Sequence, residues 1–199
     1  MRSFPTTLYR LFISVAACLL LWPPSSESVE PGELFSRIAI KPPDRVAFRE
    51  ERYNSLLKEP LVLTGYLEYL GPRKMKKVIE TPFRETFSVT EQAVVIERDG
   101  EVQKLSLRKS KSLQAMLSSI EAIIAGDEAR LAETFNLELQ DTQEGWSIRL
   151  TPKSKRVARN LDSLFVAGSD DLIRSIRISL GDGEWQLIEL LHADAGSSE

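Results

Sequence analysis

The segment SLQAMLSSIEAIIAG, residues 112–126, decides how the rest of the chain is interpreted. Its large apolar side chains recur three and four residues apart, which places them on one stripe of an α-helix. We expect Ser112 to cap the start of this helix and Gly126 to end it. The stripe needs an apolar partner, and core packing and cavity lining fit the spacing equally well. Met116 favours the cavity, because methionine adapts to apolar guests of varied shape.

Strand-like segments precede and follow this helix. They alternate apolar and polar residues and are separated by turn signals such as Asp99-Gly100 and Gly71-Pro72. Shorter helices are predicted at 33–40, 128–134 and 154–161. The predicted strands are 46–52, 61–70, 75–80, 85–90, 93–98 and 102–107 before the helix, and 135–140, 146–150, 163–167, 172–180 and 185–191 after it.

The short connections between these segments require antiparallel pairing, since parallel neighbours need long crossovers. A single twisted sheet of about eleven strands tends to curl. The predicted fold class is therefore mainly β with some helix (α+β). We expect one curved antiparallel sheet that forms a half-open barrel, with short helices covering its concave face.

The N-terminus has the order of a secretory signal peptide. Arg2 and Arg10 precede an apolar run at 11–22, and a polar break follows. The run is too short to span a bilayer convincingly. We predict a signal peptide at 1–28, a single domain at 29–192 and a flexible tail at 193–199, and hence a periplasmic protein.

Cys18 is the only cysteine, so the exported domain must fold without disulfides. The residues 15–18, Val-Ala-Ala-Cys, also resemble a lipobox, whose cysteine would be acylated and would anchor the protein. The apolar run continues after Cys18, where a lipoprotein turns polar, so a cysteine within an ordinary signal peptide is the favoured interpretation.

Catalytic patterns are missing from the sequence, and we expect no enzyme activity. The single histidine, His192, lies at the end of the chain, and no Gly-x-Ser-x-Gly elbow occurs. The acidic residues Asp170, Asp171, Asp182 and Glu184 lie in predicted turns, where they serve backbone geometry. No catalytic residue, metal ligand or cofactor is therefore assigned.

The charges give no strong signal for a partner. Twenty-six basic and 29 acidic residues are scattered along the chain and leave a net charge of −3. Nucleic acid is not an expected partner. Basic runs at 73–77 and 153–159 could contact lipid phosphates, although such runs are usually solvated faces.

The order of elements and three local motifs resemble the LolA-type periplasmic lipoprotein carriers. The motifs are Gly65-Tyr66-Leu67-Glu68-Tyr69 before Gly71-Pro72, then Arg98-Asp99-Gly100, and Leu150-Thr151-Pro152-Lys153. The resemblance implies an open barrel whose hydrophobic cavity takes the acyl chains of a lipoprotein or another lipid-linked cargo. It also implies an inner-membrane transporter as donor and an outer-membrane receptor as acceptor.

One departure from this family concerns the lid. The main carriers have an arginine before the proline that follows the Gly-x-Leu motif, where it holds the helical lid shut. Gly71 occupies that place here, and Arg73 beyond the proline is the candidate latch.

The stripe and the strands together predict the lining of an acyl cavity. Two alternatives stay open: a LolB-type outer-membrane acceptor anchored through Cys18, and a non-carrier interaction module with a solid core. The predicted lining residues are Leu67, Tyr69, Met75, Phe87, Val95, Leu113, Met116, Leu117, Ile120, Ile124, Trp146 and Ile148.

Overall fold

The structure is a computed structural model that describes residues 31–42, 44–142 and 145–192. The predicted signal peptide, Cys18 and the predicted tail at 193–199 lie outside the described residues, so these expectations stay predictions. Within the described part of the chain, no helix combines the length and apolar character that crossing a membrane requires.

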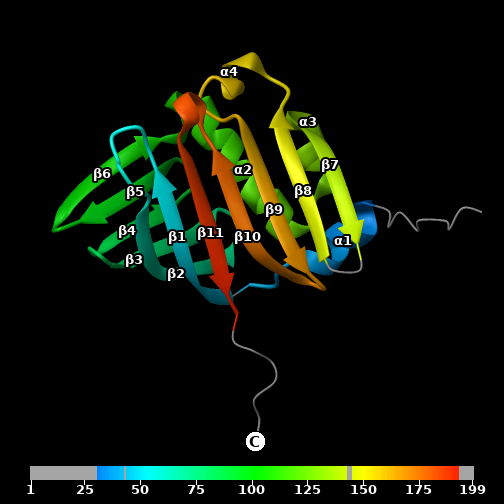
Figure 1. The fold of residues 1–199 in the computed structure, drawn as a ribbon, viewed down its shortest axis with the longest axis horizontal. Helices are drawn as coiled ribbons and strands as arrows, with labels where there is room; N and C mark the ends of the chain where they lie inside the picture. Colours follow the sequence, from blue (N-terminus) through cyan, green and yellow to red (C-terminus); the bar gives the residue numbers. More distant parts are fainter. Residues whose placement is uncertain (1–30, 43, 143–144, 193–199) are drawn as a thin grey trace, which may run out of the picture.

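Eleven antiparallel strands form one curved sheet, which confirms the predicted fold class (Figure 1). The strands are β1 (Asp44–Tyr53), β2 (Leu61–Gly71), β3 (Lys74–Thr81), β4 (Glu85–Val89), β5 (Ala93–Arg98), β6 (Glu101–Ser106), β7 (Phe135–Thr142), β8 (Gly145–Pro152), β9 (Ser163–Ser169), β10 (Leu172–Ser179) and β11 (Trp185–Leu191). Each strand pairs with its neighbour in antiparallel register, and the β2–β3 and β9–β10 ladders contain shifts of register.

The strand order is β6-β5-β4-β3-β2-β1-β11-β10-β9-β8-β7. Two runs of hairpins therefore meet at the centre, where the first strand pairs with the last, and β6 and β7 form the two open edges. The sequence predicts the hairpins from their turns but contains no local signal for the long-range β1–β11 pairing. Because the two edges stay unpaired, the barrel is half open.

Within the described ranges, four helices accompany the sheet: α1 (Pro31–Ile38), α2 (Lys111–Ala125), α3 (Glu128–Thr134) and the single turn α4 (Lys155–Ala158). Figure 1 views the sheet from its convex side, with α2 and α3 behind it. Two 3₁₀ turns, Leu107–Lys109 and Gly181–Gly183, complete the elements.

The boundaries of α2 correct one prediction. Ser110, and not Ser112, caps the helix, since its hydroxyl accepts a hydrogen bond from the Leu113 amide. A 3₁₀ turn directly before Ser110 sets this start, and the sequence spacing does not reveal it. Gly126 ends the helix as predicted, with a left-handed backbone at φ 68° that favours glycine.

A close approach between β2 and β3 accompanies an irregularity in their pairing. The register between these strands shifts at Thr64 and Gly65, as in a β-bulge. A Cβ atom at Gly65 would lie 1.8 Å from the carbonyl oxygen of Val78, so only glycine fits there. A bulge of this kind bends the strand and increases its local twist.

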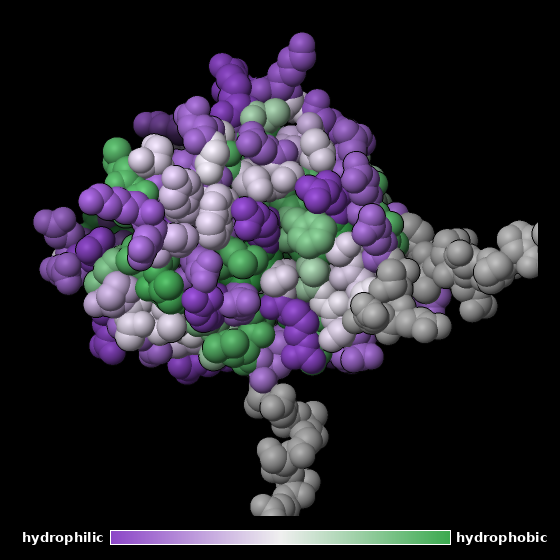
Figure 2. All heavy atoms as spheres, viewed as in Figure 1, coloured by the Kyte–Doolittle hydropathy of each residue, from purple (hydrophilic) through white to green (hydrophobic). Residues whose placement is uncertain are grey.

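The convex face carries interspersed polar and apolar residues (Figure 2). Arg45 covers the ring of Tyr66 at 3.5 Å, and Tyr53 stacks on Trp185 with ring centroids 6.0 Å apart. The concave face differs from it, because there the helices leave a cavity.

Candidate functional site

A cavity of about 340 Å³ lies between α2 and the concave face of the sheet. This volume falls in the lower part of the range of ligand pockets. Strands β1 to β6, together with β10 and β11, supply its walls on the sheet side. Its lining is mostly aliphatic and aromatic, so the cavity suits an apolar guest.

Helix α2 has two apolar faces with different surroundings. Ala115, Ala122 and Ile123 are buried in the continuous core. The rest of the predicted stripe faces the cavity and is half-buried: Leu113, Met116, Leu117, Ile120 and Ile124. The helix therefore serves as core on one side and as cavity wall on the other, and Ile123 is the one stripe residue that turns to the core.

Three contacts hold α2 over the sheet. The carboxylate of Glu121, which is buried, accepts a hydrogen bond at 3.1 Å from Arg130 on α3. The backbone amide of Ile40, after α1, donates to the carbonyl of Ile124 at 2.8 Å. The Ser112 hydroxyl donates to the carbonyl of Val157. The helix is thus fixed along its length from the side of α1, α3 and α4.

The structure brings most of the predicted lining residues together around this cavity. From the sheet, β2 supplies Leu67 and Tyr69, β3 supplies Met75, and β4 supplies Phe87. Sequence reasoning missed other lining residues, which a correct alternation of strand faces and the β1–β11 pairing would have identified: Val46, Val89, Val94, Ile96, Leu105, Ile173, Ile176, Ile178, Ile188 and Leu190.

Three predicted residues lie elsewhere. Val95 is half-buried and lies between Val94 and Ile96, which both line the cavity, so its side chain points to the opposite face of β5. Trp146 and Ile148 on β8 are buried in the core cluster with residues of α1 and α3. The alternation along β8 indicates that both side chains point to the concave face. It does not show which part of that face is filled by the helices and which part is left as a cavity.

Arg73, the candidate latch, lies in the turn between β2 and β3 with a positive φ of 56°. Its side chain is exposed at the edge of a groove that Leu117 and Glu121 of α2 also line. Among the described residues it makes no hydrogen bond or ion pair, so its role in holding a lid stays a prediction.

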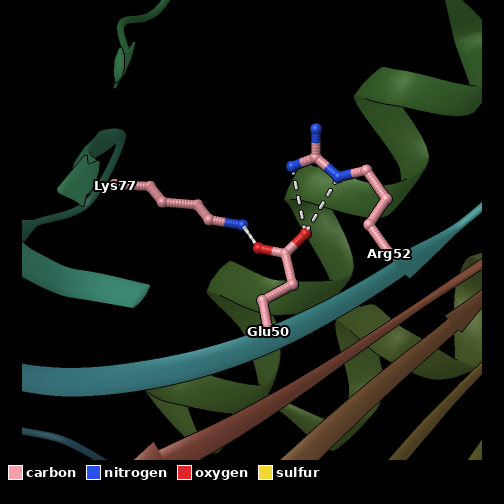
Figure 3. Close-up of polar contacts among 3 residues, drawn as sticks. All are labelled: Glu50, Arg52 and Lys77. Carbon is pink, nitrogen blue, oxygen red and sulfur yellow. Dashed lines mark hydrogen bonds and ion pairs between the residues drawn. The ribbon is translucent and has the colours of Figure 1, made fainter. Parts of the chain in front are cut away.

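A charged cluster interrupts the apolar lining (Figure 3). Glu50 on β1 is fully buried, and its carboxylate accepts hydrogen bonds from Arg52 and from Lys77 on β3. Burial lowers the pKa of Lys77 below its ordinary value, and the charge of Glu50 partly counteracts this shift. Arg52 and Lys77 both line the cavity. The alternation of Val46, Phe48, Glu50 and Arg52 along β1 is the sequence signal that could have placed Arg52 there.

The other groups considered for chemistry do not converge. His192 donates its Nε2–H to the carbonyl of Ile173 at 2.7 Å. Among the residues that the structure describes, no group of three or more histidine, cysteine, aspartate or glutamate side chains is placed to hold a metal ion. The cavity offers a mostly apolar surface that the charged cluster of Glu50, Arg52 and Lys77 interrupts.

An open antiparallel barrel with helices over an apolar concave cavity defines a class of carrier folds. The sequence places the chain within one family of that class. Residues 23–198 match the family described as outer membrane lipoprotein carrier protein LolA-like, and the chain belongs to this family. None of the curated proteins matches the sequence.

Similar solved structures include three proteins of low sequence identity. A LolA superfamily protein from Nitrosomonas europaea is 10% identical, with a TM-score of 0.42 over 83% of this chain and 93% of its own. The lipoprotein LppX from Mycobacterium tuberculosis is 12% identical, with a TM-score of 0.44 over 83% and 97%. MucB in the MucA/MucB complex of Pseudomonas aeruginosa is 13% identical, with a TM-score of 0.41 over 85% and 59%.

Proposed function

We propose that this protein is a periplasmic carrier, and not an enzyme, that holds the acyl chains of a lipoprotein or another lipid-linked cargo and ferries it toward the outer membrane. The observation that carries the proposal is the cavity between α2 and the sheet, whose walls are aliphatic and aromatic. Membership of the LolA-like family supports it.

The energetics of such binding need no catalytic group. Transfer of one methylene from water to an apolar site contributes roughly 0.8 kcal/mol. A chain of about 16 carbons, if fully buried, therefore contributes on the order of 10 kcal/mol before the costs of association. The half-buried side chains of Leu117 and Ile120 are the surface that such a chain would cover.

Release requires a competing apolar site or a movement of α2. The strands β6 and β7 are open edges, so the cavity half of the barrel is not closed by hydrogen bonds. We propose an inner-membrane transporter as the donor of cargo and an outer-membrane receptor as its acceptor. Arg73 stays the candidate latch in this scheme.

The direct test is lipid capture. The protein is purified from the periplasm, extracted for mass spectrometry of bound lipid, and then titrated with a fluorescent fatty acid that other lipids can displace. We expect stoichiometric uptake by the wild type and little by Ile120→Glu, which places a carboxylate in the cavity wall. Absence of bound lipid together with absence of uptake by the wild type would falsify the proposal.

Intact mass of the exported protein tests the anchored alternative. A free N-terminus near residue 29 is expected for a soluble carrier. An acylated Cys18 at the N-terminus would instead identify an anchored acceptor.

A further inference from the structure

The charged cluster in the cavity is rich in hydrogen-bond donors. Arg52 donates through Nε and Nη2 to the same oxygen of Glu50, at 3.2 and 3.0 Å, and Lys77 donates to the other oxygen. Arginine has five N–H groups and the lysine ammonium has three. The contacts with Glu50 use two of the five and one of the three, so donors remain on both cations (Figure 3).

The position of these donors matters more than their number. Arg52 and Lys77 line the cavity, whereas Glu50 is buried behind them. Lys77 pairs in register with Phe87 on β4, and Arg52 pairs with Gln186 on β11, and both of these partners also line the cavity. The N–H groups that make no hydrogen bond with Glu50 therefore belong to side chains that line the same cavity as the apolar wall.

The remaining charges near the cavity do not saturate these donors. Glu85 acts on Lys77 through its charge but makes no hydrogen bond with it. Glu68 forms an ion pair with Arg45 and lies opposite Lys76. Asp44 is at the other end of β1, roughly 26 Å from Arg52 at the usual rise of a strand.

We propose that Arg52 and Lys77 form a headgroup subsite for an anionic acceptor group, a carboxylate or a phosphate, at the end of the acyl chain that the cavity holds. This inference rests on the proposed function and narrows the cargo to anionic amphiphiles. Hydrogen bonds from charged donors to anionic oxygens are about twice as strong as neutral ones, and they are stronger still inside an apolar cavity. Glu50 holds the two cations in place and competes with the ligand for their donors.

The first experiment compares ligands on the wild-type protein. Palmitate, monohexadecyl phosphate and methyl palmitate are used to displace a fluorescent fatty acid at neutral pH. We expect palmitate and monohexadecyl phosphate each to bind at least about 10-fold more tightly than methyl palmitate. Acetate and inorganic phosphate at the same concentrations should displace nothing, because they lack the chain. Equal affinity for palmitate, monohexadecyl phosphate and methyl palmitate would overturn the inference.

Displacement by acetate or inorganic phosphate alone would also overturn it, since the site would then recognise a free anion. Tight binding of methyl palmitate with no preference for the anions would leave the proposed function standing while the inference fails. Failure of every lipid to bind would remove both.

Variants test the roles within the cluster. Arg52→Gln and Lys77→Gln should each reduce the preference for anionic lipid over methyl palmitate. Glu50→Gln should increase the preference, because it removes the competing carboxylate. The matched control is Arg49→Gln, which lies on the convex face of the same strand, where Arg49 pairs with Glu51 and Glu189. If the cluster serves only to stabilise the fold, no folded variant should change the preference for anionic lipid over methyl palmitate. That result would contradict the headgroup subsite.

Discussion

The helices cover the two halves of the concave face in different ways. Strands β7 to β9, with α1 and α3, form a closed half, in which side chains such as Phe35, Leu131 and Ile148 are almost fully buried. Strands β1 to β6, with β10, β11 and one face of α2, form a cavity half, where side chains such as Leu67, Phe87 and Met116 stay half-buried around the cavity. The difference arises because α1 packs against α2 and α3, whereas α2 supplies the helical wall of the other half.

One part of the sheet stabilises the fold, and another part offers a surface for binding. A filled apolar core contributes to folding, and each void weakens it. The closed half can therefore stabilise the domain while the cavity half keeps apolar surface available for a guest. Helix α2 joins the two, since neighbouring residues on it belong to different halves.

The largest expected effect distinguishes two isoleucines of α2. Ile123 is 3% exposed in the core, so Ile123→Glu places a charge where no partner exists, and we expect a loss of more than about 4 kcal/mol and failure to fold. Ile120 lines the cavity, so Ile120→Glu should lose about 1 kcal/mol or less but lose fatty-acid binding. Circular dichroism, urea unfolding and probe displacement measure these outcomes. Equal loss of folding in both variants would show that α2 has no separate cavity face.

A smaller effect is expected for truncation of side chains on the sheet. Ile148 on β8 is fully buried, and Ile148→Ala should lower the free energy of unfolding by about 2–5 kcal/mol without changing lipid affinity in the folded protein. Phe87→Ala on β4 removes half-buried surface, so we expect about 1 kcal/mol of destabilisation and weaker lipid binding. The comparison fails if Phe87→Ala is the more destabilising of the two.

Removal of the candidate latch should have a still smaller effect on stability. Arg73 is exposed and makes no hydrogen bond or ion pair among the described residues, so Arg73→Ala should change the free energy of unfolding by less than about 0.5 kcal/mol. Urea unfolding measures this, and the rate of probe release tests the latch separately. A matched substitution, Arg108→Ala, removes another arginine that lines the same groove. Faster release from Arg73→Ala alone would support a latch in the cavity half.

The free energy of unfolding should depend on pH through Lys77, which belongs to the charged cluster in the cavity half. The pKa of Lys77 is lowered on folding from an ordinary value of 10.5. Between the lowered pKa and 10.5 the unfolded chain binds more protons than the folded one, so the free energy of unfolding rises with pH in this window. Lys77→Met should lack this increment when the two proteins are unfolded by urea at a series of pH values. Parallel pH profiles would show that Lys77 is not buried as described.

The strands and hairpins could be predicted from the sequence, because turn residues and apolar–polar alternation depend only on residues that are close together in the chain. Asp99 and Gly100 both have positive φ in the β5–β6 hairpin, as their types indicate. The pairing of β1 with β11 joins opposite ends of the domain and could not be predicted in this way. The bulge at Gly65 also depends on a contact between two strands.

A lining residue could be predicted from the sequence where the face of the helix or strand that carries it is enough to place it in the cavity. The stripe of α2 and the alternation of Leu67 and Tyr69 place these residues in the cavity. Trp146 and Ile148 have the same inward orientation but belong to the continuous core, and the alternation along one strand does not reveal this difference. The charged cluster was missed because charged residues on a strand usually indicate a solvated face, whereas Glu50 is fully buried.

Contact quenching of tryptophan by a brominated fatty acid tests the difference between the two halves most directly. In the protein without residues 1–28, the tryptophans are Trp146, which is buried in the closed half, and Trp185, which stacks on Tyr53 at the convex face. Phe87→Trp adds one to the cavity wall. We expect the brominated fatty acid to quench the added emission of Phe87→Trp at stoichiometric concentration and to leave the wild-type emission nearly unchanged. Quenching of the wild type with no additional quenching in Phe87→Trp would contradict an acyl site in the cavity half.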